Sequence, residues 1–141
     1  MLINADHCPK MTITFLTVNA KGLNHPVKRK SLWTEAIRFN CDVLCTQETH
    51  FHSNKLPTCT HPKYPHVFKA NAPAKKRGVM TAIRDTVAFK LHNEIADSQG
   101  RYHILVCDIN STTYTVVNIY APNDHQICFV KMRLMTTKYA L

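Results

Sequence analysis

The stretch DVLCTQETHF, residues 42–51, runs from apolar residues directly into the polar residues Gln47, Glu48, Thr49 and His50. The apolar part predicts a buried strand, so Glu48 would lie at its carboxyl end, where the ligand sites of α/β proteins tend to form. Mg²⁺ prefers oxygen ligands and often takes only one or two carboxylates together with water. We therefore predict a metal site at Glu48, with a solvated loop glutamate as the alternative.

Other polar residues follow predicted strands in the same way. Asn19 comes at the end of a strand predicted over residues 11–18, and Tyr120 closes the run TVVNIY, with Asn118 two residues earlier on the same strand face. Each has a plainer reading, because asparagine is common in turns and a strand tyrosine usually belongs to the core. Asn123, which follows Ala121 and Pro122, also fits a turn.

Two basic clusters stand out, Lys75-Lys76-Arg77 and Lys28-Arg29-Lys30, in a chain with 18 Lys and Arg against 9 Asp and Glu. The formal charge of +9 favours a polyanionic partner such as nucleic acid, although a charge run is often only a solvated face. We expect contacts to the DNA backbone from Lys76 and Arg77 more than from the second cluster, which opens a predicted helix.

Cysteine and histidine residues crowd the same region and raise the alternative of a zinc site. Cys41 and Cys45 on one strand would be about 13 Å apart at ~3.3 Å per residue, too far to share one zinc ion. No pair of these residues has the spacing of a zinc ribbon. Three of the six cysteines lie in apolar runs, so we expect reduced core cysteines and an intracellular protein of the nucleus or cytoplasm.

The elements that must position these residues alternate between strands and helices. Strands are predicted over residues 11–18, 42–46, 66–70, 78–83, 87–91, 102–108 and 114–120, with INSTT as the connection of the last hairpin. Asn24, His25 and Pro26 predict the start of a helix that ends near Asn40, and a last helix is predicted over residues 126–138. Residues 1–10 are expected to be disordered and residues 52–65 to form a long surface loop. At 141 residues we expect one domain over 11–141, no membrane span and no oligomer.

Three segments taken together carry a resemblance: TFLTVNAKGL, DVLCTQETHF and TVVNIYAPN. With KRGVMTAI and GRYHILVCDI in order between the last two, the sequence resembles the endonuclease/exonuclease/phosphatase superfamily. Within it, the sequence is most similar to the apurinic/apyrimidinic-type endonuclease domain of non-LTR (LINE-type) retrotransposon polyproteins. The resemblance covers roughly residues 12–138.

The resemblance implies a four-layer α/β sandwich, with two mixed sheets flanked by helices, and a Mg²⁺ (or Mn²⁺) phosphodiesterase site that cuts DNA. Glu48 and Asn19 would serve the metal, Tyr120 would donate a hydrogen bond to the phosphate, and Asn118 and Asn123 would form the site wall and a backbone contact. Lys21 replaces the acidic or amide residue that many members carry at this place, and a lysine cannot ligate a cation.

Two later family segments, of the GDFN and SDH types, do not appear in this sequence. We therefore expect the N-terminal part of the domain, with little or no nicking on its own and a reverse transcriptase domain in a longer parent polyprotein. Two alternatives stay open. One is a noncatalytic retrotransposon remnant that binds nucleic acid nonspecifically, and the other is a superfamily phosphatase that acts on a small phosphorylated substrate.

Overall fold

The computed structural model describes residues 12–122. The elements in this range are β1 (Phe15–Asn19), α1 (Pro26–Arg38), β2 (Val43–Gln47), β3 (His66–Ala70), β4 (Val79–Ile83), β5 (Phe89–Ala96), β6 (Tyr102–Ile109) and β7 (Thr112–Ile119). The predictions for residues 1–10, for Asn123 and for a helix over 126–138 lie outside the described residues. Two sheets and one helix in this range confirm the predicted α/β class.

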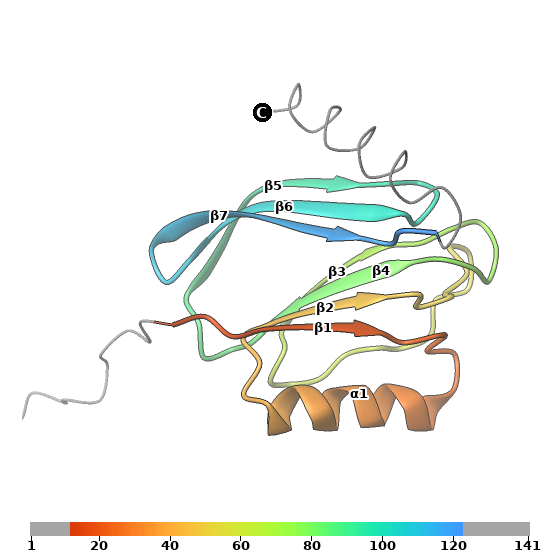
Figure 1. Ribbon diagram of the computed structural model, residues 1–141, viewed down its shortest axis with the longest axis horizontal. Coiled ribbons are helices and arrows are strands. Elements are labelled where there is room, and N and C mark those ends of the chain that lie inside the picture. The colour runs from red at the N-terminus through yellow and green to blue at the C-terminus, as the bar shows by residue number, and fades with distance from the viewer. Residues whose placement is uncertain (1–11, 123–141) are drawn as a thin grey trace, which may run out of the picture.

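The strands form a mixed sheet of order β1-β2-β4-β3 and an antiparallel sheet of order β5-β6-β7. β1 pairs with β2 in parallel, whereas β4 is antiparallel to both β2 and β3. The two sheets pack face to face, and α1 covers the outer face of the first (Figure 1). The described residues thus supply three layers of the predicted sandwich: a helix and two sheets.

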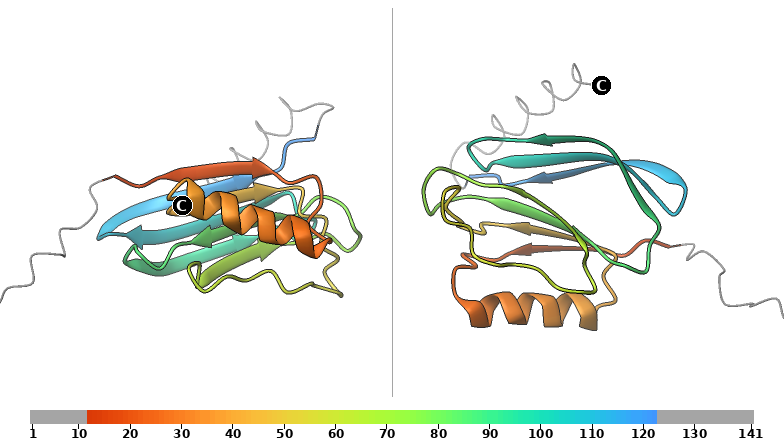
Figure 2. Two further views of the ribbon diagram at one scale, coloured as in Figure 1. Left: turned by 90° about the horizontal axis from the view of Figure 1, so that it is seen from below. Right: turned by 180° about the vertical axis from the view of Figure 1, so that it is seen from behind.

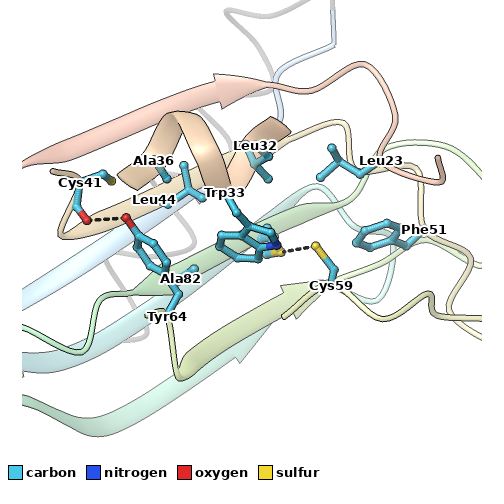
Figure 3. Packing of buried hydrophobic residues seen from close by; sticks show 11 residues of the cluster. Leu23, Leu32, Trp33, Ala36, Cys41, Leu44, Phe51, Cys59, Tyr64 and Ala82 are labelled. Carbon is cyan, nitrogen blue, oxygen red and sulfur yellow. Dashed lines mark hydrogen bonds between the residues drawn. The ribbon is translucent and has the colours of Figure 1, made fainter. Parts of the chain in front are cut away.

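One apolar core lies between α1 and the first sheet. Leu32, Trp33 and Ala36 face the sheet from the helix, and the ring of Trp33 stacks on Tyr64 at a centroid distance of 5.4 Å (Figure 3). The Tyr64 hydroxyl donates a 2.7 Å hydrogen bond to the carbonyl oxygen of Cys41. The predicted surface loop 52–65 indeed holds no helix or strand, but Cys59 and Tyr64 are buried. The loop is therefore part of the core, because Cys59 and Tyr64 belong to the apolar cluster between α1 and the first sheet.

A second core lies between the two sheets. It contains seven buried residues: Val43, Ile83, Val87, Leu105, Cys107, Ile109 and Val116. All five residues of β4 are buried, as expected for a strand that is covered on both faces. The consecutive apolar residues from which β2 was predicted have the same explanation, because β2 is also covered on both faces.

Several boundaries differ from the prediction. The first strand begins at Phe15 and includes Asn19, and β5 extends to Ala96 past a register shift between Leu91 and Asn93. β5 is an exposed edge strand with many polar residues, so no apolar pattern in the sequence indicated that it continues beyond residue 91. The last hairpin turns on Asn110 and Ser111 alone, both with positive φ as a type I′ turn requires, so β7 begins at Thr112.

The helix start is as predicted, since the His25 side chain accepts a hydrogen bond from the backbone N–H of Val27 and Pro26 occupies the first turn. No helix among residues 12–122 combines the length and the apolar character that a membrane crossing needs. The described cysteines Cys41, Cys45, Cys59 and Cys107 are not in disulfide bonds.

Candidate functional site

Residues 48–50 are held between two loops where β2 ends. On one side Gly22 N–H donates to the Glu48 carbonyl oxygen at 2.7 Å, and Leu23 N–H donates to the Thr49 carbonyl oxygen at 2.9 Å. On the other side His50 N–H donates to the carbonyl oxygen of Arg77 at 2.8 Å. The backbone of the segment that contains the predicted metal residue is therefore held by the loop after β1 and by the loop before β4.

The side chains of Asn19 and Glu48 are in direct contact. The Asn19 amide Nδ2 donates a 2.9 Å hydrogen bond to Glu48 Oε1, and its own Oδ1 accepts from the backbone N–H of Lys21 at 3.1 Å. The second carboxylate oxygen of Glu48 lies 3.6 Å from His50 Nε2, and the Glu48 side chain is 21% exposed. The parallel pairing of β1 with β2 brings these two predicted site residues together, since Asn19 pairs with Gln47.

Four residues at this end of the sheet have positive φ angles although none is glycine: Lys21 (48°), Glu48 (55°), His50 (56°) and Arg77 (56°). A side chain in this conformation costs about 1 kcal/mol or more, and such residues cluster at functional sites. Because none of these four residues is a glycine, the sequence does not indicate that they have positive φ angles. The contact of His50 with the Glu48 carboxylate was not predicted from the sequence. The feature that could have indicated it is the position of His50 two residues after Glu48.

Gly78 lets the loops approach closely. A Cβ atom built on it would lie 2.2 Å from Thr49 Oγ1, and its φ is +91°. The carbonyl oxygen of Gly78 accepts a hydrogen bond from Thr49 N–H at 3.2 Å, and the N–H of Gly78 donates to the carbonyl oxygen of Gly100 at 2.9 Å. Gly78 thus joins the Glu48 segment to the turn before β6.

Tyr120 lies at the same end of the molecule as Glu48. β7 ends at Ile119, one residue before the predicted end, and Tyr120 N–H donates to the Arg101 carbonyl oxygen at 2.7 Å. Arg101 follows Gly100, whose carbonyl binds the Gly78 loop. A short series of backbone hydrogen bonds therefore links the Tyr120 and Glu48 segments.

Asn118 is 1% exposed and bridges the two sheets. Its amide Nδ2 donates to the carbonyl oxygen of Met80 at 2.9 Å and lies 3.2 Å from Thr81 Oγ1, while its Oδ1 accepts from Gln47 Nε2 at 2.8 Å. These are the bonds of a satisfied buried amide, which supports the site through Gln47. A direct contact of Asn118 with substrate stays a prediction.

The two basic clusters have different environments. Lys75 and Lys76 are exposed and Arg77 is half-buried, and this cluster adjoins the Glu48 segment through the His50–Arg77 backbone hydrogen bond. In the other cluster, Lys28 Nζ donates to the carbonyl oxygen of Ala20 at 2.8 Å.

Arg29 uses its Nη1 to hold the carbonyl oxygens of Leu23 and Asn24 at 2.8 and 2.7 Å. Lys28 and Arg29 therefore fix the loop between β1 and α1, whereas the exposed Lys75 and Lys76 of the first cluster are available to an anion beside Glu48.

The donors at this end fit a magnesium-type ion and not zinc. Among the described residues, the polar neighbour of Glu48 Oε2 is His50 Nε2 at 3.6 Å, which leaves lone pairs of this oxygen available to a cation that keeps most of its water. Within residues 12–122, no three His, Cys, Asp or Glu side chains gather as metal ligands, so Glu48 would be a single carboxylate ligand.

The two cysteines considered for zinc lie apart. Cys41 belongs to the core under α1, whereas Cys45 packs against the core between the sheets. Burial raises the pKa of each thiol to about 11, which opposes the thiolate form that zinc needs.

Three solved structures share this fold. The crystal structure of the AP endonuclease LMAP from Leishmania major matches with a TM-score of 0.65 and 18% identity over 86% of this chain and 44% of its own. The catalytic domain of Xenopus laevis APE2 matches with a TM-score of 0.54 and 18% identity over 77% of this chain and 45% of its own. An AP endonuclease from Archaeoglobus fulgidus matches with a TM-score of 0.54 and 22% identity over 92% of this chain and 50% of its own.

The chain therefore spans about half the length of these structural neighbours. At these identities the likeness establishes the fold, which is that of AP endonucleases. No protein-family model matches the chain.

Proposed function

We propose that this chain carries the metal-binding and DNA-binding part of an endonuclease that hydrolyses phosphodiester bonds. The observation that carries the proposal is the contact between the Asn19 amide and the Glu48 carboxylate at the end of two parallel strands. The exposed Lys75 and Lys76 beside this pair suit a phosphate backbone, and the AP endonuclease fold of the neighbours supports the same reading.

Glu48 would hold Mg²⁺ or Mn²⁺ through its carboxylate, with Asn19 fixing one carboxylate oxygen. When bound, the ion would neutralise charge on the phosphoryl oxygens and favour ionisation of a water molecule. Tyr120 would donate its phenol proton in a hydrogen bond to a nonbridging oxygen. Lys76 and Arg77 would contact the DNA backbone on the side of the loop before β4, and Asn123 would contact it after β7.

Strong cleavage is not expected from residues 12–122 by themselves. Glu48 is the carboxylate that contacts Asn19, and within residues 12–122 no three His, Cys, Asp or Glu side chains gather around it as metal ligands. Among the described residues, a water molecule held there would therefore have no second carboxylate beside Glu48 to orient it. We therefore expect metal-dependent DNA binding with weak nicking.

Metal binding tests the proposal most directly. We expect Mn²⁺ titration, followed by the loss of the free-ion electron paramagnetic resonance signal, to show one site that Glu48→Gln weakens at least tenfold. Glu35→Gln is the matched control, because it removes an exposed carboxylate on α1 that pairs with Arg38. Equal Mn²⁺ affinity of the wild-type protein and the Glu48→Gln variant would refute the metal role.

DNA binding and cleavage form the second test. Fluorescence anisotropy with a labelled duplex should show an affinity that rises with Mg²⁺ and falls steeply with salt. Plasmid nicking in Mg²⁺ should be weak. Robust nicking that Glu48→Gln abolishes would confirm the endonuclease and refute the expectation of weak activity.

The single carboxylate and the adjoining Lys21 favour one other candidate, a noncatalytic nucleic-acid-binding remnant. Lys21 is exposed two residues from Asn19 and adds positive charge near the strand end. DNA binding that is unchanged by Mg²⁺ and by Glu48→Gln would favour this second function.

We also propose a finer role in retrotransposition. The order of the five sequence segments supports a target-nicking endonuclease that acts in the nucleus or cytoplasm together with a reverse transcriptase domain of a longer polyprotein. Sequencing of nicked products would test it, since a target-primed mechanism requires a free 3′-hydroxyl at the cut. Products that end in 3′-phosphate would contradict the role.

A further inference from the structure

The proposed site is divided between the two sheets. Glu48 follows β2 of the first sheet, whereas Tyr120 follows β7 of the second, and β7 packs over β2 and β4 (Figure 2). The distance between the carboxylate and the phenol therefore depends on how one sheet is placed on the other. One residue along a strand is about 3.3 Å, and an O–H···O hydrogen bond needs its oxygens within about 3.0 Å. A displacement of β7 by one residue is thus enough to separate the phenol from a phosphate held at Glu48.

The apolar core between the sheets does not fix this placement at the site end. β2 and β4 are antiparallel, with Val43 opposite Ile83 at one end and Gln47 opposite Val79 at the other. Val43 and Ile83 belong to the core between the sheets, which therefore lies toward the end away from Glu48. Apolar contacts are also non-directional, whereas a hydrogen bond restricts both distance and angle. A side-chain hydrogen bond at the Glu48 end would restrict the placement of β7 there.

Such a hydrogen bond joins the two strands that carry the site. Gln47 Nε2 donates to Asn118 Oδ1 at 2.8 Å. Gln47 is the residue before Glu48, and Asn118 lies two residues before Tyr120. The Asn118 side chain is itself fixed, since it is 1% exposed and its Nδ2 donates to the Met80 carbonyl oxygen at 2.9 Å. The bond therefore connects β2 and β7 within two residues of each proposed site residue.

We propose that Gln47 is a positioning residue, which sets the distance between Glu48 and Tyr120 through its hydrogen bond to Asn118. The inference rests on the proposed function of those two residues. A neutral amide suits this role because it bonds directionally and adds no charge beside the metal carboxylate. The Thr17 hydroxyl on β1 lies 3.1 Å from Gln47 Nε2 and helps to orient the amide.

A second connection between the two segments is less direct. Tyr120 N–H donates to the Arg101 carbonyl oxygen, and the loops around Gly78 and Gly100 are joined by a backbone hydrogen bond. This path runs through two loops before it reaches the Glu48 segment, whereas Gln47 and Asn118 belong to β2 and β7 themselves. Removal of the Gln47 amide should therefore let the ends of the two strands move apart while the fold is kept.

Fluorine NMR of the full chain, labelled with 3-fluorotyrosine, measures this distance. Mn²⁺ bound at Glu48 broadens nearby resonances by an amount that falls steeply with distance, and the signal of Tyr120 is identified by its loss in Tyr120→Phe. We expect Gln47→Met, which keeps the side-chain length without the amide, to reduce the broadening of Tyr120 at least twofold. Mn²⁺ affinity should change less than twofold, because Asn19 still holds Glu48. Broadening that stays the same or increases would overturn the proposal.

Two further variants separate positioning from a general role in folding. Thr17→Val removes the β1 neighbour of Gln47 and keeps the bond to Asn118, so it should leave the broadening unchanged. An equal reduction in Thr17→Val would overturn the proposal. Gln47→Asn is one methylene too short for the bond and should behave like Gln47→Met. If neither Gln47 variant folds, as judged by Trp33 emission, Gln47 is needed for the fold itself, which would also overturn the proposal.

The metal-free spectra decide the inference without the metal site. The fluorine resonance of Tyr120 should shift in Gln47→Met and keep its position in Thr17→Val, while that of Tyr114, on β7 but within four residues of the Asp108 end of the hairpin, should change in neither. A Tyr120 resonance that Gln47→Met leaves in place would overturn the inference. Absence of Mn²⁺ binding in the unmodified chain would instead refute the proposed function, so the two failures are distinguishable.

Discussion

Substitution of Gly78 by alanine tests the close approach that holds the Glu48 segment. Two costs are expected. The positive φ of +91° strains any residue with a Cβ, at about 1–2 kcal/mol, and the new methyl group would lie 2.2 Å from Thr49 Oγ1, an overpacking of about 1–3 kcal/mol. We expect Gly78→Ala to lower the free energy of unfolding by about 2–5 kcal/mol.

The two costs separate in a double-mutant cycle. Thr49→Ala removes the Oγ1 atom that the new methyl group would meet, so Gly78→Ala in that background should cost only the backbone strain of about 1–2 kcal/mol. Thr49→Val is the matched control. It keeps the bulk at this position while it replaces a buried hydroxyl that has no hydrogen-bond partner among the described residues, so the full cost should remain.

Urea unfolding followed by the fluorescence of Trp33, the single tryptophan of the chain, gives the measurement. Trp33 is 5% exposed in the core under α1, so its emission reports global unfolding. Equal costs of Gly78→Ala in the Thr49→Ala and wild-type backgrounds would refute the steric reasoning. Mn²⁺ affinity of the folded Gly78→Ala variant should also fall, because the segment that carries Glu48 must move.

Three further predictions concern packing, titration and charge. Asn118→Leu should lower the free energy of unfolding by about 2–3 kcal/mol in urea, since it removes the buried hydrogen bonds that Asn118 makes with the Met80 carbonyl oxygen and with Gln47 Nε2. Burial raises the pKa of the Cys41 and Cys45 thiols from 9.0 to about 11, so the stability that the protonated thiols contribute is present below pH 9 and is lost as pH rises toward 11. Thermal unfolding at pH 8 to 10.5 should show this decline, and Cys45→Ala should make it shallower. Lys76→Ala should weaken DNA binding and reduce its salt dependence in the anisotropy assay, whereas Lys63→Ala, an exposed lysine of the 52–65 loop, should not.

Much of the architecture followed from local signals. His25 and Pro26 predicted the start of α1, and the strand His66–Ala70 was predicted at its observed bounds. The apolar run before Glu48 predicted a strand covered on both faces, and the run after Gly78 predicted a further strand. These features depend on propensities and hydrophobic patterns within a few residues, which a single sequence displays directly.

The errors arose where distant residues decide the outcome. Loop 52–65 is rich in Thr, Pro and His, yet Tyr64 is buried because Trp33 and Cys41 lie beside it. β5 continues through a polar run because β6 supplies its backbone partners. No pattern among neighbouring residues in the sequence indicates either the burial of Tyr64 or the extension of β5.

For the site, the sequence by itself determined which groups are available: a carboxylate at Glu48, an amide at Asn19 and a basic segment ending at Arg77. Only the tertiary structure decided that the first two touch, because their contact requires the parallel pairing of β1 with β2 across the intervening helix. It also decided the positive φ of Glu48, which hydrogen bonds from two neighbouring loops impose. The sequence specifies the chemistry of each side chain directly, whereas the distance between two side chains depends on the packing of every element between them.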